Sequence, residues 1–190
     1  MLDLEKIHLK HILDMSTPRD RAFFCMMAQT GLRPSTIANL KLKDIEPEFS
    51  RGFNPCKIDI PEGYFTFMPE ETIKHLRTYF MTRGKLEPED WLFTCQGVDK
   101  KLNVKSMAGL FFRAVNKLDL KDLRQKAPGK PRNVRLYCLR KFFRRWASFA
   151  GIEYVNFWTG CKTNCETKNI EFHRALYREQ VAFNLSLQSN

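Results

Sequence analysis

The sequence predicts a mainly α-helical fold with a small antiparallel β-sheet, built as one domain. Apolar residues at helical spacing (i, i+3, i+4, i+7) recur along most of the 190 residues. Two adjoining runs of strand-forming residues, Cys56–Ile60 and Tyr64–Met68, flank Pro61-Glu62-Gly63 and predict a hairpin. The length suits a single core, and no linker or internal repeat divides the chain.

The N-terminal part predicts three helices. Leu4–Met15 is short and amphipathic. The second helix begins at residues 16–20, which combine a hydroxyl cap, a proline in the first turn and an early acid. It is apolar nearly all round, as a central buried helix is, and Gly31 ends it. A third helix over 34–42 leaves Arg33 in a tight corner beside a helix N-terminus.

Beyond the hairpin, helical periodicity returns in five stretches. These are residues 69–82, 104–118, 132–151, 152–160 and 170–187. A loop is expected over 84–90, and Trp91–Phe93 is either a third short strand or a packed turn. Residues 121–131 are predicted to form a basic loop.

The helix predicted over 132–151 carries an arginine at the border of its apolar face. Its apolar stripe consists of Leu136, Leu139, Phe143, Trp146, Ala147 and Ala150. Arg140 falls at the edge of this stripe, between Tyr137 and Arg144. A guanidinium there costs stability unless an anion or a cage of hydrogen-bonding groups receives it. Because arginine grips phosphate with two parallel hydrogen bonds, the pattern indicates a core helix that presents an arginine to a phosphate.

Basic residues concentrate in one segment. Residues 121–150 contain ten Lys or Arg and one acid, so they carry +9 of the formal net charge of +11. This density favours a nucleic acid over a membrane surface, because no amphipathic helix with an open apolar face accompanies it. A solvated basic surface is the alternative. The expected nucleic-acid contacts are Lys130, Arg132, Arg135, Lys141 and Arg144.

Several function classes are disfavoured by what the sequence lacks. No apolar run is long enough to span a membrane, and the N-terminus is too charged for a signal peptide. The six cysteines include no CxxC pair, which fits the reducing cytoplasm. Cys161, Cys165 and His173 lack a fourth ligand and the usual spacing, so no metal site is expected. The sequence contains no glycine-rich phosphate loop, so no nucleotide cofactor is expected.

Three motifs follow one another along the chain. Thr30–Leu40 reads TGLRPSTIANL and is followed by Asp44-Ile45, Tyr137–Phe143 reads YCLRKFF, and Ile152–Cys161 reads IEYVNFWTGC. They resemble the first arginine box, the His-x-x-Arg box and the Leu-Gly-His segment of tyrosine recombinases, such as phage and archaeal integrases. The order and spacing match from about Leu4 to Leu187.

The resemblance implies that residues 1–190 form the catalytic domain of such an enzyme, without the core-binding domain that usually precedes it. The implied function is site-specific DNA recombination or integration, as in an archaeal or viral mobile element. Double-stranded DNA is cleaved and rejoined through a 3′-phosphotyrosyl intermediate, without a cofactor and with self-association on the DNA. The alternative is a catalytically degenerate domain that binds DNA or regulates a partner recombinase without cleaving.

The family's site residues carry over position by position. Arg33 and Arg140 match the two arginines that hold the non-bridging oxygens of the scissile phosphate. Tyr137 replaces the usual histidine, and a phenol can still donate a hydrogen bond. Cys161 replaces the second histidine or tryptophan, which changes how protons are handled there.

Two roles in the family's mechanism have more than one interpretation here. The hairpin lysine protonates the leaving 5′-hydroxyl in the family. The turn 61–63 lacks a lysine, so Lys57 is the nearest candidate, or else a solvated strand lysine. Tyr177 is the one tyrosine downstream of Cys161 and the candidate nucleophile, but it also lies on an apolar stripe and suits core packing. An altered nucleophile, or one supplied in trans, is the third interpretation.

Overall fold

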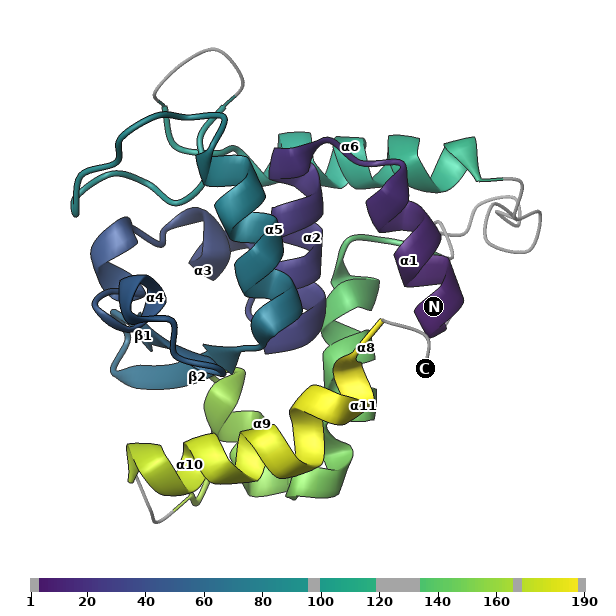
Figure 1. Ribbon diagram of the computed structural model, residues 1–190. Coiled ribbons are helices and arrows are strands. Elements are labelled where there is room, and N and C mark those ends of the chain that lie inside the picture. Colours follow the sequence, from purple (N-terminus) through teal and green to yellow (C-terminus); the bar gives the residue numbers. More distant parts are fainter. Residues whose placement is uncertain (1–3, 96–99, 119–133, 166–168, 188–190) are drawn as a thin grey trace.

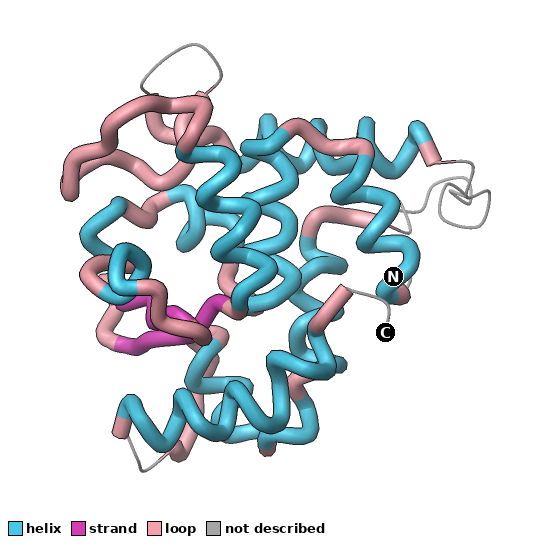
Figure 2. The backbone as a smooth tube through the Cα atoms, in the orientation of Figure 1, coloured by secondary structure: helices cyan, strands magenta, loops and turns pink. Residues whose placement is uncertain are grey.

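Figure 1 shows the computed structural model, which describes residues 4–95, 100–118, 134–165 and 169–187. Across these residues the chain is mainly helical, with one two-stranded antiparallel sheet at the side of the helices (Figure 2). The predicted fold class is confirmed.

Helix α2 (Pro18–Thr30) forms the centre of the molecule. It packs against α1 (Lys6–Asp14), α5 (Glu70–Phe80), α6 (Val104–Lys117) and α8 (Tyr137–Trp146). All its residues from position 22 onward are buried, as its apolar character predicts.

Gly31 ends α2 for two physical reasons. Its φ of 65° lies in the left-handed region, which favours glycine. A Cβ at this position would lie 2.2 Å from the Phe143 ring, so the residue also allows α8 to pack closely. The end of α2 and the middle of α8 are thereby brought into contact.

The third predicted helix is shorter than expected. Helix α3 covers Pro34–Ala38, and a 3₁₀ turn, η1, follows at Leu42–Asp44. Leu40 accepts a backbone hydrogen bond from Leu92, and Lys41 forms an isolated β-bridge with Trp91. This pairing keeps residues 40 and 41 extended instead of helical. Trp91 and Thr94 form isolated β-bridges on either side of a bend, so 91–93 is not a regular strand. A short helix, α4 (Glu48–Arg51), was not predicted.

The hairpin has the predicted limits, β1 at Cys56–Ile60 and β2 at Tyr64–Met68. Its register pairs Ile60 with Tyr64 and Lys57 with Phe67, so Tyr64 and Lys57 lie on opposite faces of the sheet. Helix α9 (Ile152–Trp158) packs against β2.

The helix expected over 132–151 is shorter in the structure, where α8 starts at Tyr137. It ends at Trp146 and a 3₁₀ turn, η2 (Ser148–Ala150), follows. The last predicted helix is confirmed as a continuous helical segment. It consists of α10 (Ile170–Tyr177), a wider π turn η3 (Arg178–Ala182) and α11 (Phe183–Leu185).

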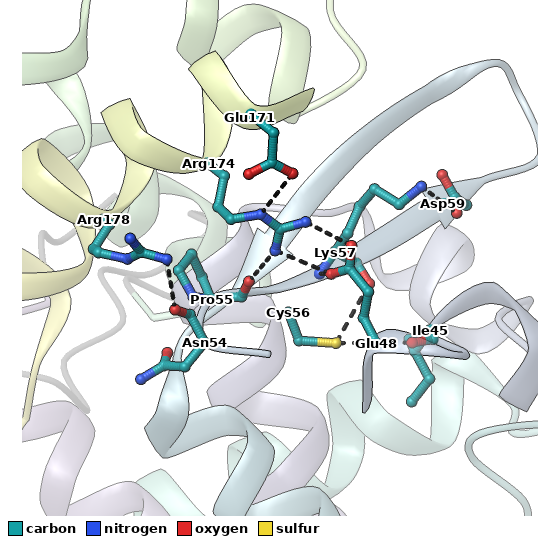
Figure 3. A network of polar contacts seen from close by, with 10 residues as sticks. All are labelled: Ile45, Glu48, Asn54, Pro55, Cys56, Lys57, Asp59, Glu171, Arg174 and Arg178. Atoms are coloured by element: carbon teal, nitrogen blue, oxygen red, sulfur yellow. Dashed lines mark hydrogen bonds and ion pairs between the residues drawn. The ribbon is translucent and has the colours of Figure 1, made fainter. Parts of the chain in front are cut away.

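A buried ion pair joins α10 to α4, next to the start of the hairpin (Figure 3). Arg174 of α10, whose side chain is 5% exposed, donates two hydrogen bonds to the Glu48 carboxylate and one to the Pro55 carbonyl. Its Nε lies 3.4 Å from Glu171, and Arg178 donates to the Asn54 carbonyl. The C-terminal helix therefore holds the start of β1 in place.

Candidate functional site

Arg140 lies inside the core rather than at its edge. The residue is 2% exposed, although the predicted stripe placed it at the border of the apolar face. The two positions just before it on α8 that face inward, Cys138 and Leu139, are buried as well, and so is Phe142. Buried side chains therefore cover more of α8 than the predicted stripe, which explains why Arg140 has no access to solvent.

The Arg140 guanidinium is held by a cage of hydrogen-bond acceptors. Its Nη1 donates to the Gly31 carbonyl, and its Nη2 donates to the Thr159 carbonyl at 2.9 Å and to Cys161 Sγ at 3.3 Å. The Nε has no hydrogen-bond partner among the described residues. Of the two expected ways to receive this charge, an anion or a cage, the described residues supply the cage.

Cys161 lies between two guanidinium groups. Arg144 Nη1 is 3.7 Å from its Sγ and also donates to the Thr159 hydroxyl, while Nη2 donates to the Asn156 side chain. Partial burial disfavours the thiolate. The Thr159 hydrogen bond and the charges of Arg140 and Arg144 outweigh it, and the pKa of Cys161 falls below its ordinary value.

In front of Cys161 is an open pocket of about 390 Å³. Its walls come from α3, the hairpin, α9 and the loop after α9, and the lining residues are Arg33, Thr36, Glu62, Tyr64, Phe157, Gly160, Cys161, Lys162 and Thr163. Arg33 is exposed, and its Nη2 donates to the Gly160 carbonyl over 3.4 Å. Arg33 and Arg140 thus reach the same turn, one from the solvent side and one from the core.

Two pocket residues were missed in the sequence analysis. Tyr64 opens β2, and Lys162 is exposed directly after Cys161. Neither belongs to a motif, and the proximity of each to Arg33 results from the folding of separate segments. The nearest sequence signal for Tyr64 is its place directly after the hairpin turn, where a catalytic lysine was sought.

The Tyr64 hydroxyl is packed against the turn that Arg33 contacts. A Cβ on Gly160 would lie 2.6 Å from the phenol oxygen, so the glycine leaves room for it. Burial and then the charge of Glu62 raise the pKa of Tyr64, while a Thr36 hydrogen bond and the charges of Arg140 and Arg33 oppose the rise. The phenol is therefore protonated at neutral pH, and it interacts electrostatically with both arginines.

The predicted residues on and before α8 lie at different depths. Tyr137 is 47% exposed, one helical turn before Arg140, and Arg135 is exposed. Lys141 and Arg144 are half-buried. Lys130 and Arg132 lie outside the described residues.

Lys57 lies apart from the pocket. Its ammonium is 2.8 Å from the Asp59 carboxylate (Figure 3). The strand register places its side chain on the sheet face opposite Tyr64. It has therefore neither the orientation nor the free charge that the hairpin lysine of the resemblance would need. This pairing favours the strand-lysine alternative.

Tyr177 is completely buried, and its ring contacts Phe67 and Trp158. Its hydroxyl donates to the Gln29 carbonyl. Burial raises the pKa of this phenol well above its ordinary value. The contacts favour the core-packing alternative for Tyr177.

The described residues hold no cluster of three or more His, Cys, Asp or Glu side chains arranged to bind a metal ion. Within the same residues, the helices are all too short or too polar to cross a membrane.

No protein-family model and no curated protein matches this sequence. Two solved structures are similar to it in fold. XerA recombinase aligns with 94% of this chain at a TM-score of 0.66 and 18% identity. A lambda integrase dimer bound to a COC′ core site aligns with 87% at a TM-score of 0.58 and 14% identity.

The alignments cover 65% of the XerA chain and 59% of the integrase chain, so this chain spans about three fifths of each. They show that the chain has the fold of a tyrosine recombinase catalytic domain, as the three motifs predicted.

Proposed function

We propose that residues 1–190 are the catalytic domain of a tyrosine recombinase that acts on double-stranded DNA. The proposed reaction is strand cleavage and rejoining through a 3′-phosphotyrosyl intermediate, without a metal or nucleotide cofactor. One observation carries the proposal. In a recombinase-type fold, Arg33, Cys161 and Arg140 meet at the Gly160 turn beside an open pocket. We further propose that the protein acts in the cytoplasm and self-associates on DNA.

The pocket suits a phosphate group electrostatically. Arg33 is exposed and makes one long hydrogen bond among the described residues, which leaves most of its donors available to the non-bridging oxygens. Lys162 adds a second exposed cation. Arg140 and Arg144 place positive charge on the core side of Cys161. This fixed charge stabilises the negative charge that develops on the phosphate in the transition state, with little reorganisation of the protein. Direct contact of Arg140 with the phosphate exchanges one of its cage acceptors for a phosphate oxygen.

The exposed phenol of Tyr137 is proposed to donate a hydrogen bond to the same phosphate, and Cys161 to stand where the family's second histidine stands. Tyr177 acts as the nucleophile only if its hydroxyl leaves Gln29 and the last helix shifts. A tyrosine supplied by a second copy of the chain satisfies the same chemistry. DNA contacts are proposed for Arg135, Lys141 and Arg144, and in the basic loop for Lys130 and Arg132.

The test uses a nicked suicide duplex that carries a candidate attachment site, incubated with the protein and separated on a denaturing gel. A covalent protein–DNA band is the expected product. Loss of this band in Tyr177→Phe identifies Tyr177 as the nucleophile. A band that persists in Tyr177→Phe excludes that residue and directs the search to a second copy. Undiminished cleavage by Arg33→Ala would contradict the proposed mechanism.

One observation favours a second candidate function, a degenerate domain that binds DNA or regulates a partner recombinase without cutting. The tyrosine downstream of Cys161 is buried, and its hydroxyl is bonded to the core. This alternative predicts no covalent band together with salt-sensitive DNA binding. The control adds a separately expressed core-binding domain of a tyrosine recombinase, because weak DNA capture by residues 1–190 alone would also give no covalent band.

A further inference from the structure

The hairpin presents a phenol to the pocket where the resemblance leads one to seek a lysine. Lys57 is paired with Asp59 on the sheet face opposite the pocket. The turn 61–63 contains a glutamate and no lysine. Tyr64 is the first residue after that turn and lines the same pocket as Arg33 and Cys161. Its ring is held by the Gly160 turn, so its position is fixed by packing.

The other tyrosines of the chain are placed differently. Tyr79 is 4% exposed and its hydroxyl is within hydrogen-bonding distance of Thr94. Tyr154 packs on Trp158 and Phe172, and Tyr177 is buried. These three do not line the pocket, and Tyr137 does not either. Of the five tyrosines, Tyr64 alone combines a wall position with both arginine charges.

We infer that Tyr64 is a catalytic residue, the general acid that protonates the leaving 5′-oxygen when a DNA strand is cut at this pocket. The inference rests on the proposed function. As the oxygen of the nucleophilic tyrosine bonds to phosphorus, its hydroxyl proton passes to water. The bond from phosphorus to the 5′-oxygen breaks and its electron pair stays on that oxygen. The Tyr64 proton moves to the oxygen and leaves a phenolate, which water reprotonates.

The surroundings of Tyr64 suit this proton transfer both before and after the proton leaves the phenol. Before the reaction, burial and Glu62 keep the phenol protonated by raising its pKa, so the proton is present at neutral pH. After the transfer, the charges of Arg33 and Arg140 stabilise the phenolate. A phenol and a lysine ammonium have similar ordinary pKa values, both about 10, so the two groups are comparable proton donors before burial and Glu62 raise the pKa of Tyr64.

The experiment compares two suicide duplexes, one unmodified and one in which sulfur replaces the bridging 5′-oxygen. A sulfur leaving group departs as a thiolate and needs no proton. Tyr64→Phe keeps the ring and removes the proton. It is expected to slow covalent-complex formation about 10²- to 10⁴-fold on the oxygen duplex and to restore the wild-type rate on the sulfur duplex. DNA binding, measured by gel shift, and the thermal midpoint are expected to stay at wild-type values.

Two variants serve as controls. Tyr154→Phe removes a hydroxyl outside the pocket and is expected to cleave both duplexes as the wild type does. Arg33→Ala is expected to be slow on both, because its proposed contacts are to non-bridging oxygens.

Three results overturn the acid role while leaving the proposed function intact. They are wild-type cleavage of the oxygen duplex by Tyr64→Phe, equal slowing of both duplexes by Tyr64→Phe, and sulfur rescue in Lys57→Ala instead. A wild-type protein that cuts neither duplex refutes the cleavage function and the acid role together.

Discussion

Arg33 and Arg140 carry the same charge in opposite surroundings. Arg33 is exposed, and within the part of the chain that the structure describes it makes one long hydrogen bond, to a carbonyl. Arg140 is 2% exposed and donates to two carbonyls and a thiol. The two residues are therefore placed for different roles. Arg33 is available to a ligand, and Arg140 joins the end of α2 to the turn after α9 while placing positive charge behind the pocket.

This difference predicts different costs of substitution. Arg140→Ala leaves the buried Gly31 and Thr159 carbonyls without donors and opens a cavity, so it is expected to lower the free energy of unfolding by about 3–5 kcal/mol. Arg33→Ala is expected to change it by less than about 0.5 kcal/mol. Urea denaturation measures both. Equal losses would contradict the division of roles, and the expected result makes Arg33→Ala the cleaner variant for functional tests.

The elements around the site depend on a joint distant from it. Helix α10 is joined to α4 by the pair Arg174–Glu48, beside the start of β1, where Glu48 also accepts a hydrogen bond from the Lys57 backbone N–H (Figure 3). Burial raises the pKa of Glu48. The hydrogen bonds and charge of Arg174, with a backbone hydrogen bond from Lys57, lower it by more, and the net shift is downward. The ion pair beside the start of β1 thus makes the stability of the folded protein depend on pH.

A pH dependence follows from that shift. Because the pKa of Glu48 is lower in the folded protein than in the unfolded chain, its contribution is complete above the ordinary glutamate pKa and disappears as the pH falls through the folded value. Arg174→Met is expected to lower the free energy of unfolding near neutral pH by about 3–5 kcal/mol, because it leaves a half-buried carboxylate unpaired.

The same variant is expected to lose less stability than the wild type as the pH falls from the ordinary glutamate pKa through the lower pKa of Glu48 in the folded protein. Guanidinium denaturation at a series of pH values measures both effects. Lys74→Met provides the control, because its partner Glu70 is exposed and the pair contributes little. A parallel loss of stability with pH in the wild type and in Arg174→Met would contradict the assignment to Glu48.

At the scale of the whole molecule, the distribution of charge favours a polyanionic partner for the pocket. The chain carries a formal +11, and +9 of it comes from residues 121–150. The described part of that segment, residues 134–150, contains α8. Cationic side chains therefore lie on the same helix as Arg140, which contacts Cys161 at the pocket. A long polyanion can contact α8 and the pocket together, whereas an isolated phosphate can use the pocket alone.

DNA binding is therefore expected to weaken steeply with salt. The logarithm of the affinity falls by about 0.9 per phosphate contact for each tenfold rise in salt. Arg33→Ala, which removes one proposed contact, is expected to reduce that slope by about 1 and to weaken all sequences alike. Fluorescence anisotropy over a salt series on two unrelated duplexes measures it. An unchanged slope would exclude Arg33 as a phosphate contact.

The sequence by itself determined the elements whose signals are local. The hairpin limits, the start of α2 at its proline and its end at Gly31 were predicted from turn and capping chemistry, which acts over a few residues. The fold was also predictable, because three motifs resemble those of tyrosine recombinases in order and spacing.

The tertiary structure decided whatever depends on distant partners. α3 is short because Leu40 and Lys41 pair with residues 91 and 92, and Arg140 is buried because Gly31 and Thr159 approach it from elsewhere in the chain. The membership of Tyr64 in the pocket has the same origin. Helical periodicity identifies which residues share a face, but the depth of burial and the neighbours of a side chain are set by contacts between segments far apart in sequence.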